Sequence, residues 1–134
     1  MLAVSALAVS GCGATSKGAT TPRPPAPINL TVYVDNSRVS VSPTTVGAGP
    51  VAFIITNQAS QAESLSILPA GSSAGQPLAD TGPINPQATA QVTVNFTSPG
   101  SYTVSADGTG SSLRGATIHV GAARQSSANQ VLQP

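Results

Sequence analysis

Few side chains in this sequence are of the types that carry out chemistry. Only 7% of the 134 residues are Asp, Glu, Lys or Arg, and the chain has one histidine, His119, and one cysteine, Cys12. Nucleophilic catalysis needs a nucleophile beside a general base, and the sequence has no GxSxG, HExxH or phosphate-binding glycine motif. We therefore predict that the protein is not an enzyme and holds no disulfide and no cofactor.

His119, Glu63 and Asp107 are the residues to consider as metal ligands. In the expected alternation of its strand, His119 points to the side opposite its two apolar neighbours, which favours a surface residue over a ligand. Glu63 and Asp107 supply hard oxygen ligands of the kind that Ca²⁺ takes, with solvated loop carboxylates as the alternative. The sequence therefore predicts no metal centre.

The charge pattern excludes one class of partner. The formal net charge is +1, and Lys and Arg do not cluster as they do on nucleic-acid-binding surfaces. The charged residues of the predicted folded part are Arg38, Arg114, Asp35, Glu63, Asp80 and Asp107. Its surface must therefore be mostly Ser, Thr, Asn and Gln, and it gives no electrostatic indication of a partner.

The N-terminal segment has the features of an export signal. An apolar run at residues 2–9 is too short to span a bilayer. Residues 9–12, Val-Ser-Gly-Cys, resemble the lipobox of bacterial lipoproteins, in which the cysteine is acylated and becomes the first residue after cleavage. The resemblance implies a signal peptide at residues 1–11, with a free cysteine in a tail as the alternative. No Lys or Arg precedes the apolar run, so we expect the signal to start upstream of Met1.

Lipid on Cys12 would fix the cellular location. Each buried methylene of an acyl chain such as palmitate contributes about 0.8 kcal/mol, so two or three chains hold a protein at a membrane. Residues 12–27 include the run TTPRPPAP and are predicted to be an extended tether. We expect a lipid-anchored protein of the cell envelope, on the extracytoplasmic face of the membrane.

Residues 28–121 are predicted to form one all-β domain. Its centre is the stretch 42–57, SPTTVGAGPVAFIITN, read as a tight connection at 47–50 and then a buried strand with Val51, Phe53 and Ile55 inward. Alternating apolar residues predict further strands at 28–35, 39–41, 64–68, 89–96, 102–105 and 116–120. No segment has a helical period, and regularly spaced strands with turns between them indicate a β-sandwich or barrel.

The remaining segments are predicted to be irregular. Residues 69–86, rich in Gly, Ser and Pro, are read as mostly loop with a short edge segment at 78–79, and as a place for a binding surface. Residues 107–112 form a second predicted loop, and residues 122–134 a disordered tail. Tyr102, just after a Pro-Gly pair, is read as a structural tyrosine that anchors a corner of the sandwich rather than as a binding residue.

The order of these motifs resembles a cupredoxin over nearly all of residues 28–121. The segments that carry the resemblance are Pro43, 46–57 (VGAGPVAFIITN), 64–67 (SLSI), 84–86 (INP), the strand to Phe96, 99–102 (PGSY) and 113–120 (LRGATIHV). The resemblance implies a Greek-key β-sandwich or barrel. An immunoglobulin- or fibronectin-like sandwich is the alternative, because residues 99–104 also fit those families.

Cupredoxins that bind copper use a His, a Cys, a second His and commonly a Met. The resemblance places Glu63 at the first His, Ala106 at the Cys, residue 110 or 111 at the second His, and Leu113 at the Met. A type 1 site needs a thiolate and two imidazoles, so the resemblance implies a domain without blue-copper electron transfer.

Two functions follow as expectations. The first is a binding or structural module at the cell envelope, whose loops at 69–86 and 107–112 contact another exported protein or a ligand. The alternative is metal handling, in which copper or another metal binds weakly through Glu63, His119 or the tail and is delivered elsewhere.

Overall fold

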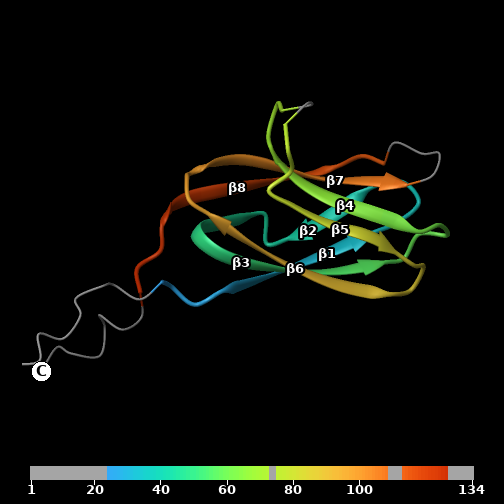
Figure 1. Cartoon of the computed structure of the whole chain (residues 1–134), viewed down its shortest axis with the longest axis horizontal. Coiled ribbons are helices and arrows are strands. Elements are labelled where there is room, and N and C mark those ends of the chain that lie inside the picture. Colours follow the sequence, from blue (N-terminus) through green and yellow to red (C-terminus); the bar gives the residue numbers. More distant parts are fainter. Residues whose placement is uncertain (1–23, 73–74, 109–112, 127–134) are drawn as a thin grey trace, which may run out of the picture.

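The computed structural model describes residues 24–72, 75–108 and 113–126, which form strands and no helix (Figure 1). The strands are β1 (Ile28–Val34), β2 (Val39–Ser42), β3 (Thr45–Asn57), β4 (Glu63–Pro69), β5 (Ala79–Ile84), β6 (Thr89–Phe96), β7 (Gly100–Gly108) and β8 (Ala116–Ala123). Within these ranges there is accordingly no helix of the length and hydropathy needed to cross a membrane. Residues 1–23, with the predicted signal, Cys12 and most of the tether, lie outside the described ranges, as do residues 109–112 and 127–134.

Strand β3 joins two parts of one mixed sheet. Its second half pairs with β1 in parallel and with β6 antiparallel, and β1 pairs with β2. Its first half pairs in parallel with β8, from which the order continues through β7 and β4 to β5. The two parts form the layers seen in Figure 1, so a single long strand connects both layers of the sandwich.

The predicted tight connection at residues 47–50 is wrong, because β3 runs through it without a break. The strand bends there instead. The register against β8 shifts between Gly47 and Ala48, and Gly49 has a φ of +131°, which side-chain-bearing residues rarely adopt. Glycine accepts this conformation without a Cβ clash, so the strand bends from one layer to the other without ending.

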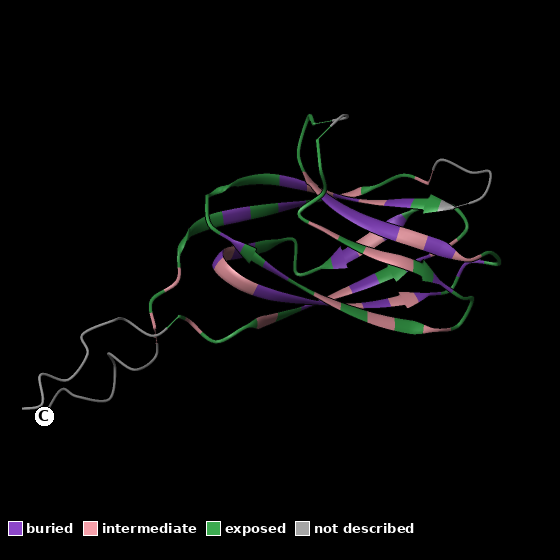
Figure 2. Cartoon of the chain, in the orientation of Figure 1, coloured by how far each residue is buried: buried purple, intermediate pink, exposed green. Residues whose placement is uncertain are grey.

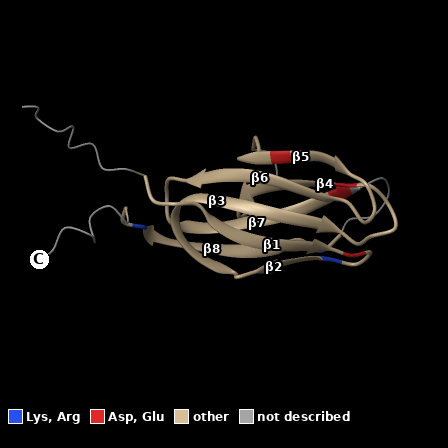
Figure 3. Cartoon of the chain, turned by 90° about the horizontal axis from the view of Figure 1, so that it is seen from below, with Lys and Arg blue, Asp and Glu red and all other residues tan. Residues whose placement is uncertain are grey.

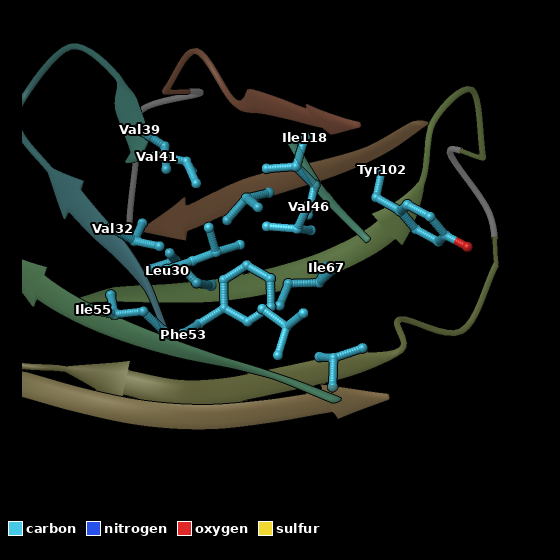
Figure 4. Packing of buried hydrophobic residues seen from close by; sticks show 14 of the residues in the cluster. Leu30, Val32, Val39, Val41, Val46, Phe53, Ile55, Ile67, Tyr102 and Ile118 are labelled. Carbon is cyan, nitrogen blue, oxygen red and sulfur yellow. The ribbon is translucent and has the colours of Figure 1, made fainter. Parts of the chain in front are cut away.

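Alternation places the core between the layers (Figure 2). The predicted inward residues of the central strand, Val51, Phe53 and Ile55, are at most 1% exposed. Figure 4 shows Phe53 among side chains from several strands. Its ring lies 6.2 Å from that of Phe96, which in turn lies 4.6 Å from the ring of Tyr102. Aromatic rings at these spacings stabilise a core beyond their buried area.

Tyr102 anchors a corner, as predicted. Its ring is buried, and its hydroxyl donates a hydrogen bond to the carbonyl oxygen of Ser98 at 2.9 Å. Residue 98 lies in the turn between β6 and β7. The bond therefore fixes the path by which the chain passes from one layer to the other.

The structure differs from the prediction at two further strands. Residues 79–84 form β5, paired with β4, where mostly loop was expected. A bulge interrupts the alternation of this strand, so residue periodicity did not predict it. Gly82 has a φ of +64°. The Thr81 hydroxyl, in place of a backbone carbonyl, accepts a hydrogen bond from Leu65 N at 3.0 Å. Strand β8 also continues to Ala123, beyond the predicted end at Gly121.

The strand directions define two ends of the sandwich. The tether end is where β1 begins at Ile28 and β8 finishes at Ala123. The opposite end, here called the distal end, holds the connections 35–38, 58–62 and 85–88 together with residues 113–115. Figure 1 shows the start of β1 and the end of β8 on one side and these connections on the other.

Candidate functional site

Glu63 and Ala106, which the family resemblance aligned with copper ligands, lie close together at the distal end. Glu63 pairs with Gly108, and Leu65 pairs with Ala106, on the neighbouring strands β4 and β7. The two residues are therefore diagonal neighbours on one face, about 7 Å apart. Both are buried, Glu63 at 2% and Ala106 at 4% exposure, so this face is the interior.

Glu63 is an unusual interior residue. Its Oε2 atom is buried and has no hydrogen-bond partner among the described residues. Carboxyl groups seldom occupy protein interiors without a partner, because burial removes their hydration. Among the aligned positions that the structure describes, Glu63 is thus the one whose side chain carries a polar group.

The side chains at the aligned positions do not fit type 1 copper. Ala106 presents a methyl group, and Leu113 is an aliphatic side chain packed against the core. Neither has an atom that donates electrons to copper, and one carboxylate does not replace a thiolate and two imidazoles. Residues 110 and 111, aligned with the second His, lie outside the described ranges, and neither is a histidine.

The structure does not bring the predicted metal candidates together. Ser64 pairs with Asp107 and Glu63 with Gly108, so the side chains of Asp107 and Glu63 point to opposite faces of the sheet. His119 pairs with Ser101 at the far end of β7. Seven residues of strand, about 23 Å, separate that position from Gly108. Among the described residues, no three His, Cys, Asp or Glu side chains gather closely enough to hold a metal ion.

His119 is exposed, as predicted, but it has a neighbour that sequence reasoning missed. Its Nδ1 lies 3.1 Å from the hydroxyl oxygen of Ser101, the residue opposite it on β7. A catalytic pair of this kind needs a third group that orients the imidazole and donors for an oxyanion. No described carboxylate contacts the ring, so the contact is read as a surface hydrogen bond.

The connections of the distal end are held together by Asn57, a residue that the sequence analysis did not select. Asn57 is fully buried; its Nδ2 donates to the carbonyls of Gln61 and Ile84, both at 2.8 Å, and its Oδ1 accepts from Ala59 N at 2.8 Å. The Oδ1 of Asn36 accepts from both the backbone N and the hydroxyl of Ser60. The signal available in the sequence was an Asn at the end of an apolar strand, where its side chain forms a turn two residues on.

Asp35 begins a second fixed turn at the distal end. Its Oδ1 accepts hydrogen bonds from the Ser37 hydroxyl at 2.6 Å, Ser37 N at 2.7 Å and Arg38 N at 2.9 Å. The Ser37 hydroxyl does most to lower the pKa of this carboxyl below its ordinary 3.8, and the two backbone N–H groups lower it further. Three hydrogen bonds to one carboxylate oxygen thus help to order this turn.

The predicted binding loop at residues 69–86 does not lie at one end of the sandwich. Pro69 pairs with Tyr102 near the start of β7, but residues 79–84 form β5 and residues 85–86 belong to the distal end. The second predicted loop is wrong at Asp107 and Gly108, which end β7, and residues 109–112 lie outside the described ranges. Beside the first lies an open hollow of about 200 Å³, and the residues that line it are Leu68, Pro69, Gly71, Ser72, Thr103 and Ser105.

Charged residues are sparse over the described chain (Figure 3). Of the three arginines that the structure describes, Arg124 lies at the tether end, where its side chain donates to the carbonyls of Gly47, Ala26 and Pro50. A Cβ on Gly47 would lie 2.5 Å from the Arg124 side chain, so this glycine leaves the space that the arginine fills. The other two, Arg38 and Arg114, are at the distal end.

Comparison with known proteins identifies the fold. No protein-family model and no curated protein sequence matches the chain. Among solved structures, reduced auracyanin from the photosynthetic bacterium Roseiflexus castenholzii is similar, with a TM-score of 0.51 and 16% identity over 70% of this chain and 95% of that one. Auracyanin A, a blue copper protein from the green thermophilic photosynthetic bacterium Chloroflexus aurantiacus, also gives 0.51 and 16%, over 71% and 99%.

A multicopper oxidase structure is also similar, with 17% identity over 74% of this chain and 45% of that one and a TM-score of 0.46. The two auracyanins establish that the fold is a cupredoxin-like β-sandwich, which confirms the predicted fold class over the immunoglobulin-like alternative. At this identity the likeness concerns the fold alone.

Proposed function

We propose that this protein is a lipid-anchored, exported binding module with a cupredoxin-like fold and no type 1 copper site. The observation that carries the proposal is the interior of the distal end. The strands that would support a copper centre are present. At two of the positions aligned with copper ligands, however, Ala106 and Leu113 carry aliphatic side chains that pack with the core. The fold alone does not assign a function, and an aliphatic interior offers no ligand to a metal, so we assign the function to the surface of the domain.

The arrangement of the two ends supports a role in presentation. If Cys12 carries lipid, residues 12–27 connect the membrane to Ile28, at the tether end. Arg124 holds the carbonyl of Ala26 against this end. The distal end then faces away from the lipid, and its connections are already ordered by Asn57 and Asn36. An ordered loop loses less entropy on binding than a mobile one.

The membrane half of the proposal is tested by Cys12→Ser. We expect the wild-type chain to incorporate labelled palmitate and to sediment with membranes, and the variant to do neither. Ser16→Thr, which lies outside the motif at residues 9–12, serves as a control for general damage to the N-terminal segment. A wild-type chain recovered without lipid in the soluble fraction would remove the anchor from the proposal.

The binding half is tested by capture from envelope extract. The full chain is immobilised through the lipid-bearing end, and proteins retained on it are compared with those on an unrelated lipidated β-sandwich. We expect at least one exported protein to be retained specifically. If nothing is retained above the control, the chain is not a binding module.

Metal handling is the second candidate, and the buried Oε2 of Glu63 is the one observation in its favour. Glu63 and His119 lie too far apart to hold one ion, so each would act without the other. Equal affinity for Cu²⁺ in the wild-type chain and in Glu63→Ala and His119→Ala variants would remove this candidate.

A further inference from the structure

Arg38 and Arg114 lie side by side at the distal end. They form an isolated parallel bridge between the residues that precede β2 and β8. The carbonyl of Arg114 accepts from Val39 N at 2.8 Å, and Arg114 N donates to the carbonyl of Ser37 at 3.2 Å. These two bonds lie on either side of Arg38. The side chains of the two arginines therefore point to the same face of the bridge, and their backbones are about 4.8 Å apart.

Two like charges at paired positions repel each other, and the surrounding charges do little to offset this. The Arg38 side chain is 65% exposed, and its Nε lies 3.9 Å from Asp35 Oδ2, which is a loose ion pair. The other oxygen of Asp35 is already occupied by its turn. Within the described part of the chain, no group accepts a hydrogen bond from the Arg114 guanidinium, and this residue is exposed.

We propose that Arg38 and Arg114 together bind a carboxylate, so that the partner of the proposed binding module contacts the distal end through an acidic segment. This inference rests on the proposed function and names the chemistry of its partner. Each guanidinium offers planar pairs of N–H donors that match a carboxylate, and two such groups can hold one carboxylate from both sides.

Charge balance favours a carboxylate over a phosphate. The cluster contains two guanidinium groups and the Asp35 carboxylate, which leaves a single positive charge for the ligand to neutralise. One Asp or Glu side chain supplies this charge, whereas a phosphate dianion exceeds it. The described domain has no further free cations to extend the site toward a polyanion, since Arg124 is bound at the tether end.

The experiment is a titration of the full chain, labelled with ¹⁵N, with an acetylated and amidated Gly-Glu-Gly peptide, which carries a single carboxylate, at low ionic strength. The Nε–H signals of the arginines are followed. We expect the signals of Arg38 and Arg114 to move together and that of Arg124 to stay, because its Nε is bound to the carbonyl of Gly47. An equal concentration of inorganic phosphate should move the first two signals less.

Variants distinguish binding at the two arginines from a general effect of net charge on peptide affinity. Arg38→Gln and Arg114→Gln should each weaken peptide binding about tenfold, the usual effect of losing hydrogen bonds to a charged group. Gln91→Glu changes the net charge by the same amount on the exposed face of β6 and should weaken binding less than about twofold. All these positions are exposed, so the variants should keep the wild-type backbone spectrum.

Three results would overturn the inference. The first is a titration that moves neither arginine signal. The second is a loss of affinity in Gln91→Glu as large as that in Arg114→Gln. The third is a phosphate response as strong as that of the peptide, which would replace the carboxylate with a general anion.

The capture experiment distinguishes this inference from the proposed function. If the Arg38→Gln, Arg114→Gln double variant retains the same exported protein as the wild type, the inference fails and the binding function stands. If the wild type itself retains nothing, the binding function fails, whatever the peptide titration shows.

Discussion

The Nη1 atom of Arg124 donates a hydrogen bond to the carbonyl oxygen of Ala26 at 2.6 Å, and this bond joins the end of the last strand to the segment that precedes the first. The same side chain reaches the carbonyls of Gly47 and Pro50, on either side of the bend in β3. One guanidinium group thus fixes the bend, the exit of the tether and the C-terminal end of the fold.

Arg124→Gln should therefore destabilise the domain. The shorter, uncharged side chain cannot make all three contacts, and partly buried carbonyls lose a charged donor. We expect the free energy of unfolding to fall by about 2 kcal/mol, measured by urea denaturation of the full chain. Arg38→Gln removes an exposed arginine and should change stability by less than about 0.5 kcal/mol. Equal stability of the two variants would contradict the role of Arg124.

Tyr102→Phe tests the corner between β6 and β7. The variant keeps the ring against Phe96 but loses the donor to the carbonyl of Ser98. We expect a loss of about 1 kcal/mol in the free energy of unfolding. Tyr33→Phe is the matched control, because Tyr33 is 47% exposed and should tolerate the change. Equal stability of the two variants would show that the corner does not depend on the Tyr102 hydroxyl.

Much of this scaffold follows from the sequence because it depends on local alternation. The inward residues Val51, Phe53 and Ile55 of β3 are of this kind. The anchoring role of Tyr102 also follows from local sequence, because the residue comes just after a Pro-Gly pair. The continuity of β3 does not follow, since Gly-Ala-Gly-Pro is also a turn sequence and only pairing with β8 decides between them. Strand β5 is hidden by its bulge at Gly82.

The distal end could be predicted only in part. Glu63 and Ala106 were selected through family resemblance, and the register of two strands then placed them on one face. Asn57 contacts Ile84 across 27 residues of chain, and Arg38 meets Arg114 through a bridge between segments far apart in sequence. Contacts of this range depend on topology, which residue periodicity does not encode.

Glu63→Met tests the cost of the buried carboxyl. Methionine has a similar volume and suits the apolar interior beside Ala106, and it removes an oxygen that has no described partner. We expect an increase of about 1 kcal/mol in the free energy of unfolding at neutral pH. Asp107→Asn, at an exposed position on the other face, should have little effect. A clear loss of stability in Glu63→Met would instead show that the carboxyl binds a stabilising group.

The turn at Asp35 makes a specific prediction about acid. A carboxyl with a lowered folded-state pKa stabilises the fold at pH values above its unfolded pKa near 3.8, and this contribution is lost as the pH falls through the lower folded value. Ser37→Ala removes the strongest donor to Asp35.

In ¹³C spectra of the carboxyl groups, we expect the titration midpoint of Asp35 to rise in Ser37→Ala. The stability difference between the variant and the wild type should be present at neutral pH and should shrink in acid. An unchanged midpoint would mean that the backbone donors alone set the pKa of Asp35.

The most direct test of the central claim is the copper content of the full chain after incubation with Cu²⁺ and desalting, read together with the visible spectrum. Because Ala106 and Leu113 offer no ligands, we predict less than stoichiometric copper and a colourless protein. His119→Ala is measured in parallel to remove adventitious binding at the exposed imidazole. Stoichiometric copper in both proteins, with an intense visible absorption band, would contradict the claim that this cupredoxin-like domain works without a copper centre.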